Sequence, residues 1–211
     1  MKPIQFMPRT HILDTTRKRT GQLEYRIGTW NIRSLYKPGA LKSISDAVKK
    51  YKNVQIVALQ EVRWPGEGDM RTNGMTLFYS GSSNGKYENG VGFLVNDQLL
   101  PSIKKFTPVN DRICHIRIAG KQYDIILICV YSPTETGEED LKDMFYDELE
   151  RVYNGLSGHC LKIILGDFNS QVGRETIYRP TIGSESIHDL SNGNGTRLVE
   201  FAIANGPHSE Q

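Results

Sequence analysis

Short apolar runs rich in β-branched residues recur along this chain, and they limit its possible folds more than any other feature. Each run is long enough for one strand but short for a helix, and turn-forming residues separate the runs. The expected strands are residues 25–30, 54–59, 75–79, 91–95, 113–118, 123–131 and 161–165. Strands as apolar as 123–131 belong in the interior of a packed sheet.

Three other segments carry apolar residues at helical spacing. Pro38 opens the first, in the position of a helix that proline favours. Its apolar stripe consists of Leu41, Ile44, Val48 and Tyr51. Thr136 and Glu139 form a capping-box pattern that opens the second helix, and the third covers about residues 196–205. The order of elements favours an α/β fold with two mixed or antiparallel sheets packed face to face and helices outside.

Length and composition are those of an ordinary globular domain. The chain has 211 residues, of which 38% are hydrophobic and 24% are charged. No run approaches the roughly 18 apolar residues that a membrane span needs. The N-terminus also lacks the apolar segment of a secretory signal. We therefore expect one intracellular domain over residues 25–211, with no membrane partner.

The three cysteines and the charge distribution give weaker indications. Cys114, Cys129 and Cys160 are widely spaced, which disfavours a zinc site and predicts reduced core thiols. Residues 1–26 carry six Lys or Arg and two Asp or Glu, a net charge of +4, whereas the rest of the chain carries −2. We expect residues 1–24 to be a flexible basic arm. Such an arm can contact phosphates nonspecifically or can simply be a solvated tail.

Polar side chains follow three of the expected buried strands. Asn31, Glu61 and the segment Asp167-Phe168-Asn169 each come directly after an apolar run. Carboxylates and amides that converge at strand ends are typical of sites in α/β proteins. Two carboxylates at one rim repel each other unless a cation or a proton joins them, and Mg²⁺ accepts one or two carboxylates together with water. The sequence therefore predicts an Mg²⁺ site.

Each of these motifs also has an ordinary interpretation. A glutamate after a strand is usually just exposed, and an Asp-Phe-Asn segment is usually a turn. Tyr131-Ser132-Pro133 can equally be the end of a strand. No single motif decides between a site and a loop.

The ordered set of motifs does point to a family. It consists of Thr29-Trp30-Asn31, Leu59-Gln60-Glu61, Tyr131-Ser132-Pro133 and Gly166-Asp167-Phe168-Asn169. This set resembles the signature of the endonuclease/exonuclease/phosphatase superfamily, over about residues 25–206. A finer resemblance is carried by residues 27–35, 59–64, 89–93, 194–195 and 198–206. There the chain is similar to RTE/BovB-type retrotransposon endonuclease domains and to craniofacial development protein 2-like proteins.

This resemblance implies a four-layer DNase I-like sandwich and Mg²⁺-dependent phosphodiester hydrolysis, with Mn²⁺ as an alternative ion. The reaction would be the nicking of DNA. Glu61 would ligate the metal, and Asn31 would support the metal or the phosphate. Arg63 and Trp64 would contact the substrate, and they mildly favour a nucleic acid.

The resemblance also implies three catalytic residues. Tyr131 would hydrogen-bond the scissile phosphate or help to place the leaving group. Asp167 would orient or deprotonate the attacking water, and Asn169 would donate to phosphate oxygens that gain charge. These roles suit a reaction that needs an aligned nucleophile, neutralised oxygens and a stabilised leaving alkoxide.

The family's pattern continues beyond the last expected helix. Two further core strands follow there, and they supply an aspartate and a catalytic histidine. In this sequence, residues 207–211 follow Gly206, and they contain His208 but no neighbouring aspartate. We therefore expect a fold that lacks the last core strands and a rate impaired by the loss of an acid–base group. We do not expect His188, which precedes Asp189, to replace the missing histidine.

Two alternative functions stay open. The chain can be a non-catalytic, transposon-derived remnant that binds nucleic acid or protein, or a phosphatase or phosphodiesterase of the same superfamily. For the leading interpretation, the expected partner is DNA and the expected state is a monomer in the nucleus rather than the cytoplasm. A reverse transcriptase domain would belong to a full-length parent.

Overall fold

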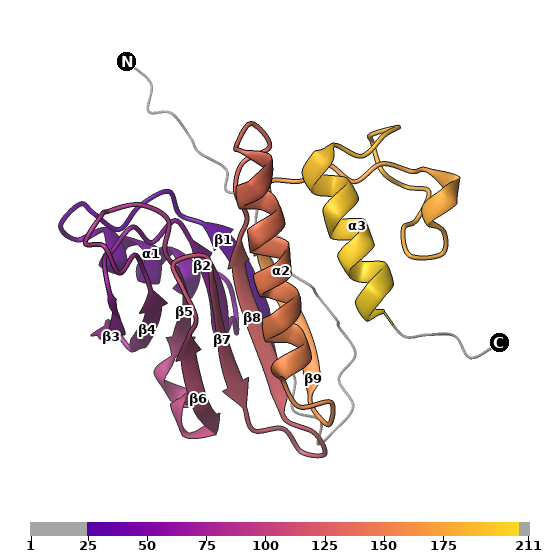
Figure 1. Ribbon diagram of the computed structural model, residues 1–211. Helices are drawn as coiled ribbons and strands as arrows, with labels where there is room; N and C mark the ends of the chain where they lie inside the picture. The colour runs from indigo at the N-terminus through magenta and orange to yellow at the C-terminus, as the bar shows by residue number, and fades with distance from the viewer. Residues whose placement is uncertain (1–24, 207–211) are drawn as a thin grey trace. The chain divides into compact units, whose positions relative to one another are not determined.

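The computed structural model describes residues 25–206, which fall into two compact units (Figure 1). The first unit comprises residues 25–131 and 159–166, and the second comprises residues 132–158 and 167–206. The predicted basic arm and residues 207–211 with His208 lie outside the described residues.

The first sheet of the first unit has five strands in the order β1-β2-β5-β4-β3. Its strands are β1 (Ile27–Asn31), β2 (Ile56–Gln60), β3 (Glu67–Thr72), β4 (Met75–Ser80) and β5 (Val91–Asn96). β1 and β2 are parallel, and the helix α1 (Ala40–Lys49) connects them, as parallel neighbours require a crossover. The remaining pairs are antiparallel, so the sheet is mixed.

The second sheet has four strands in the order β6-β7-β8-β9. Its strands are β6 (Ile103–Pro108), β7 (Ile113–Ile118), β8 (Ile125–Tyr131) and β9 (Leu161–Asp167). β6, β7 and β8 are antiparallel. The start of β9 lies beside the start of β8, where the Leu161 N–H donates to the carbonyl of Asp124, and Gly166 near its end lies against Val130. β9 therefore runs parallel to β8. A short 3-10 helix, η1 (Asp97–Ser102), joins the two sheets along the chain.

The core of the first unit lies between the two sheets, and α1 covers the other face of the first sheet. The alternation of side chains along β2 explains both contacts. Ile56 and Ala58 pack against the second sheet, whereas Val57 and Leu59 pack against α1. β2 is therefore buried on both faces, which fixes the position of the residues that follow it.

The second unit contains two helices, α2 (Glu139–Gly155) and α3 (Gly193–Asn205), with a 3-10 turn η2 (Thr176–Tyr178) between them in sequence. The hydroxyl of Tyr146 donates to the carbonyl of Asn194 at 3.1 Å. The rings of Tyr153 and Phe201 meet edge to face, with centroids 5.7 Å apart. These contacts pack α2 and α3 against each other.

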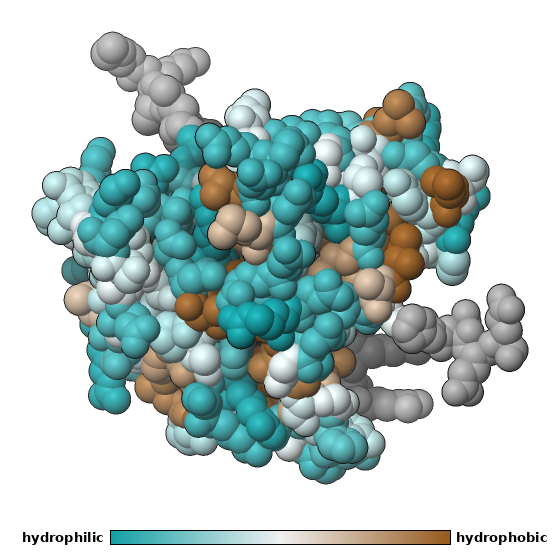
Figure 2. Space-filling view, in the orientation of Figure 1, coloured by the Kyte–Doolittle hydropathy of each residue, from teal (hydrophilic) through white to brown (hydrophobic). Residues whose placement is uncertain are grey.

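Figure 2 shows a mostly hydrophilic face with hydrophobic groups over the segment between β9 and α3. Ile177, Ile187 and Leu190 lie in this segment, and all three are more than 70% exposed. These three side chains of the segment therefore contribute little apolar packing. Among residues 25–206, no helix is long and apolar enough to cross a membrane.

The predicted fold class is confirmed, with two packed sheets and helices, but three local predictions were incomplete or wrong. β3 and β6 were not predicted. β3 is largely polar and exposed, and it pairs with β4 through its backbone. The capping box is absent: α2 begins at Glu139, and that carboxylate accepts hydrogen bonds from Lys142 and Arg197 instead. The three cysteines are free, but Cys160 is only partly buried.

Gly166 of β9 gives a direct test of how β8 and β9 pack. A methyl group on Gly166 would lie 2.0 Å from the carbonyl oxygen of Val130, which backbone pairing holds in place. We expect Gly166→Ala to lower the free energy of unfolding by about 1–3 kcal/mol. The control is Gly28→Ala in β1, where the new methyl group would lie 3.7 Å from Val57. Equal thermal stability of the two variants would contradict this packing.

Candidate active site

Glu61 follows the last residue of β2, and its side chain is 13% exposed. Glu61 and Arg63 both have left-handed backbones, with φ of 58° and 55°, which non-glycine residues rarely adopt. Val62 between them is fully buried, and its N–H donates to the carbonyl of Gly90 at 3.0 Å. The Arg63 N–H donates to the carbonyl of Asn89 at 2.8 Å. Packing and hydrogen bonding of Val62 thus compensate for the strain in the segment that carries Glu61.

Three side chains of the first unit surround the Glu61 carboxylate. Asn31 at the end of β1 lies beside Gln60 in the parallel pair, and its Nδ2 donates to Oε1 of Glu61 at 2.8 Å. The Nη2 of Arg63 donates to Oε2 at 2.5 Å. Tyr131, the last residue of β8, also makes a side-chain hydrogen bond to Glu61. The structure therefore brings together four of the predicted site residues, Glu61 with Asn31, Arg63 and Tyr131.

These contacts decide the charge of Glu61. Partial burial alone raises the pKa of its carboxyl group, but hydrogen bonds from Asn31, Arg63 and Tyr131 and the positive charge of Arg63 outweigh that effect. The net result is a pKa below the usual value of 4.5. Glu61 is therefore ionised at neutral pH, as a ligand for a hard cation must be.

Arg112 contacts both the backbone and the ring of Tyr131. The Tyr131 N–H donates to the carbonyl of Arg112 at 2.9 Å, and Nη1 of Arg112 donates back to the carbonyl of Tyr131 at 3.1 Å. The guanidinium carbon of Arg112 also lies 5.4 Å from the centroid of the tyrosine ring, a cation–π distance. Arg112 thereby fixes both the backbone and the ring of Tyr131.

The loop that carries Arg112 is tied to the segment that carries Glu61. Asn89 donates its Nδ2 to Oδ2 of Asp111 at 2.8 Å, and the Gly90 N–H donates to the carbonyl of Asp111 at the same distance. Gly90 and Asn89 in turn accept hydrogen bonds from Val62 and Arg63. Hydrogen bonds thus link the segments that carry Glu61 and Tyr131. Asp111 and Arg112 were not predicted from the sequence, because no local pattern marks either residue.

Arg63 and Trp64, the predicted substrate-binding pair, have different surroundings. Arg63 is 44% exposed and is paired with Glu61. Trp64 donates its Nε1 to the carbonyl of Leu35 at 3.1 Å, and its ring meets that of Tyr79 edge to face at 5.3 Å. Trp64 therefore helps to pack the residues around α1, and contact of either side chain with substrate stays a prediction.

Asp167 and Asn169 belong to the second unit. The Asn169 N–H donates to Oδ1 of Asp167 at 3.0 Å, and its Nδ2 donates to the carbonyl of Ser132 at 2.9 Å. The Ser132 N–H donates to the carbonyl of Asp167 at 3.0 Å. An amide nitrogen carries two hydrogens, so the bond to Ser132 uses half of the donor capacity of Asn169. The five predicted catalytic and metal-binding residues thus fall into two groups, one in each unit.

The Asp189 carboxylate and the His188 backbone N–H each have another partner in the structure. The carboxylate of Asp189 forms an ion pair with Arg174. The His188 N–H donates to Oγ of Ser186 at 3.1 Å. The expectation that His188 has no catalytic role stays a prediction.

The donor set around Glu61 fits a hard divalent cation. Within residues 25–206, no three His, Cys, Asp or Glu side chains gather in a group that could hold a metal ion. Mg²⁺ does not require such a group, because one carboxylate with water and phosphate oxygens suffices. Asn31 turns its Nδ2 to Glu61, while its Oδ1 accepts from the Arg33 N–H at 3.1 Å. Asn31 therefore orients the carboxylate.

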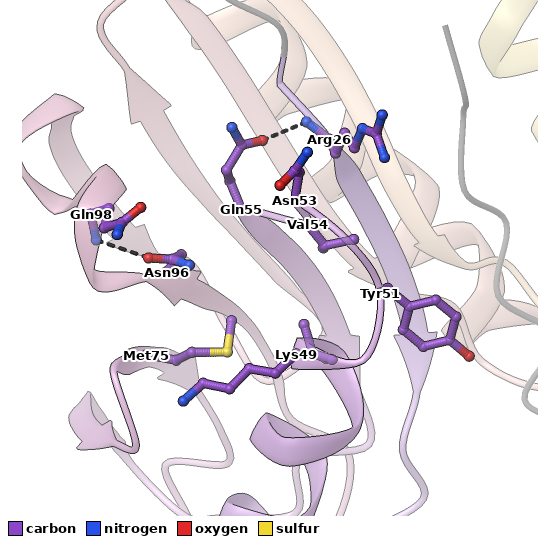
Figure 3. Close-up of a pocket in the computed structure, with 10 residues that line it drawn as sticks. Arg26, Lys49, Tyr51, Asn53, Val54, Gln55, Met75, Asn96 and Gln98 are labelled. Carbon is purple, nitrogen blue, oxygen red and sulfur yellow. Dashed lines mark hydrogen bonds between the residues drawn. The ribbon is translucent and has the colours of Figure 1, made fainter. Parts of the chain in front are cut away.

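A pocket of about 320 Å³ in the first unit lies apart from these residues (Figure 3). Arg26 and Gln55, which precede β1 and β2, line it and are joined by a hydrogen bond from the Arg26 N–H to Oε1 of Gln55. Asn31 and Glu61 lie at the opposite ends of the same strands. None of the predicted site residues lines this pocket, so it is not part of the candidate site.

The two-sheet core defines a DNase I-like fold. Two solved structures share it. The endonuclease domain of TRAS1, a telomere-specific non-LTR retrotransposon, matches with a TM-score of 0.55 and 17% identity over 86% of this chain and 70% of its own. AP endonuclease LMAP from Leishmania major matches with a TM-score of 0.57 and 14% identity. That match covers 91% of this chain and 71% of the LMAP chain. The predicted likeness to this fold is confirmed.

The chain belongs to the Endonuclease/Exonuclease/phosphatase family, whose sequence profile matches residues 28–207. It is also 31% identical over 192 residues to craniofacial development protein 2 of Bos taurus and 30% identical to that of Tragulus javanicus. Each alignment covers 91% of this chain but only 32% or 33% of the relative. The chain therefore spans about a third of the length of these curated relatives. The family resemblance found in the sequence is confirmed.

Proposed function

We propose that the chain is an Mg²⁺-dependent DNA endonuclease of retrotransposon origin, which nicks DNA by phosphodiester hydrolysis. The observation that carries the proposal is the ionised Glu61 carboxylate, held by Asn31, Arg63 and Tyr131 at the ends of strands in a DNase I-like fold. The retrotransposon endonuclease among the similar structures supports the choice of DNA.

The metal site of this proposal is centred on Glu61. Glu61 would ligate Mg²⁺, or Mn²⁺ in its place, and Asn31 would hold the carboxylate in position through the 2.8 Å hydrogen bond. When bound, the ion supplies positive charge that neutralises phosphate oxygens. Arg63 now neutralises part of the Glu61 charge, so its guanidinium must share the carboxylate with the ion or move to the substrate phosphate.

The remaining roles are assigned to side chains that can donate or accept a proton. Asp167 would accept a hydrogen bond or a proton from the water that attacks phosphorus. Asn169 would donate to a non-bridging oxygen, and the Tyr131 hydroxyl would donate to the oxygen that leaves as the P–O bond breaks. Each role places a polar group where charge changes during the reaction.

A substrate panel tests the proposal. The chain would be incubated with Mg²⁺ and supercoiled plasmid, with p-nitrophenyl phosphate as a phosphomonoester, and with phospholipid vesicles. Nicked plasmid that requires Mg²⁺ and is abolished by EDTA supports the endonuclease. Hydrolysis of the phosphomonoester or the lipid alone would contradict it in favour of a different phosphoesterase. Intact plasmid that is nevertheless retarded in a gel would contradict it in favour of a non-catalytic binding protein.

Arg112 should affect the rate through Tyr131. We expect Arg112→Met to lower the nicking rate by about 10- to 100-fold, since a group displaced by roughly 1 Å costs that much. The methionine retains apolar volume but loses the hydrogen bond to the Tyr131 carbonyl and the cation over its ring. The control is Arg71→Met, which removes an exposed arginine from β3. Equal rates for both variants would show that Arg112 does not position Tyr131.

A further inference from the structure

Asn194 is the second residue of α3, and its side chain is completely buried. Its Nδ2 donates two hydrogen bonds, to the carbonyl of Pro133 at 2.9 Å and to the carbonyl of Asn169 at 3.1 Å. Pro133 follows the end of β8 in sequence, and Asn169 follows the end of β9. One side chain thus joins the two segments that follow these strands.

The bond from Asn194 completes the restraint on Asn169. The backbone of Asn169 is left-handed, with φ of 47°, a conformation that asparagine tolerates but that needs support. Its N–H is held by Asp167 and its side-chain amide by Ser132. The Asn194 amide holds the backbone carbonyl, so the backbone N–H, the backbone carbonyl and the side-chain Nδ2 of Asn169 are all hydrogen-bonded.

Attachment of α3 alone does not explain the Asn194 side chain. The carboxylate of Glu135 already accepts the N–H groups of Gly193 and Asn194, at 3.0 and 2.9 Å. Tyr146 also donates to the backbone carbonyl of Asn194. The Asn194 Oδ1, in contrast, is buried and accepts no hydrogen bond from the described residues, which is costly. The two hydrogen bonds that Nδ2 donates, to the carbonyls of Pro133 and Asn169, explain why an amide is buried here despite its unpaired Oδ1.

We propose that Asn194 is a positioning residue, which holds Asn169 in the conformation that presents its side chain to the phosphate. The inference rests on the proposed function for its consequence in catalysis. Its structural part, the restraint of residues 167–171, is independent of activity. Asn194→Asp removes the donor and keeps the shape, whereas Asn194→Ser removes both bonds without adding charge.

Two measurements would be made on the full chain. The first is hydrogen–deuterium exchange of residues 167–171, which we expect to rise by about tenfold in both Asn194 variants, the effect of one lost hydrogen bond. The second is the kinetics of plasmid nicking with Mg²⁺. We expect kcat to fall by about 10- to 100-fold with little change in KM, because the loss affects the transition state rather than binding.

The matched control is Glu135→Ala, which weakens the attachment of α3 but leaves the bond from Asn194 to Asn169. A rise in exchange and a fall in kcat confined to the Asn194 variants would support the proposal. The same changes in Glu135→Ala, or unchanged exchange in both Asn194 variants, would overturn it. An inactive wild-type chain would overturn the proposed function, while the exchange measurement would still decide whether Asn194 restrains Asn169.

Discussion

Glu61→Gln is expected to lower the single-turnover rate of Mg²⁺-dependent DNA cleavage by about 10³-fold or more, the factor that corresponds to several kcal/mol of transition-state stabilisation by a metal. The glutamine has the same shape, and its oxygen can still accept the hydrogen bond from Asn31. It lacks the negative charge that Arg63 balances now and that a divalent cation requires. The substitution therefore removes the charge with little change in geometry.

Stability and metal affinity separate this effect from unfolding. The loss of the partly exposed ion pair with Arg63 should cost only about 1 kcal/mol or less, so thermal melting should change little. Calorimetry should show weaker Mg²⁺ binding. The control is Glu67→Gln on the exposed β3, which should cleave at the wild-type rate. A Glu61→Gln protein that is folded and fully active would exclude Glu61 as the metal ligand.

Asp167→Asn is expected to lower the cleavage rate by about 10²–10⁴-fold, the usual contribution of a positioned acid–base group. The new amide retains an oxygen that can accept the Asn169 N–H, so the turn should be preserved. What disappears is the carboxylate that would orient the attacking water or accept its proton. Single-turnover kinetics of a duplex oligonucleotide would measure the loss.

Magnesium affinity distinguishes Asp167 from Glu61. If Asp167 acts on water, calorimetry should give nearly wild-type Mg²⁺ binding in Asp167→Asn. The control is Asp189→Asn, which removes a carboxylate that is 78% exposed in the same unit and paired with Arg174. Loss of Mg²⁺ binding together with activity would assign Asp167 to the metal instead, and an unchanged rate would remove it from the reaction.

The apolar runs were sufficient to predict most of the strands, because burial decides those elements. All five residues of β2 are buried, and its alternation matches the two layers that it separates. β3 escaped prediction because four of its six residues are exposed and backbone pairing with β4 holds it in place. The capping-box pattern failed because Lys142 and Arg197 engage the Glu139 carboxylate. Hairpin pairing decided the first case, and Arg197, which lies 58 residues from Glu139 in sequence, contributes to the second.

The site residues also divide into those that local sequence predicts and those that only the fold reveals. Asn31 and Glu61 were predicted from their places at the ends of apolar runs, and the role of Tyr131 was implied by the family resemblance. The structure places Asn31 and Tyr131 at the Glu61 carboxylate. Arg112 and Asn194 were not predicted to have a role at the site. Arg112 acts on a residue 19 positions away, and Asn194 acts on one 25 positions away. No local pattern encodes such partners, since only the fold brings them together.

Nicking of supercoiled plasmid across a series of Mg²⁺ concentrations, by the wild-type chain and by Glu61→Gln, tests most directly whether Glu61 carries metal-dependent cleavage. We expect wild-type nicking to increase with Mg²⁺, to saturate and to stop when EDTA is added. The Glu61→Gln protein should leave the plasmid supercoiled at the same concentrations. Wild-type plasmid that stays intact at every Mg²⁺ concentration, nicking that persists in EDTA, or equal nicking by the two proteins would contradict this role.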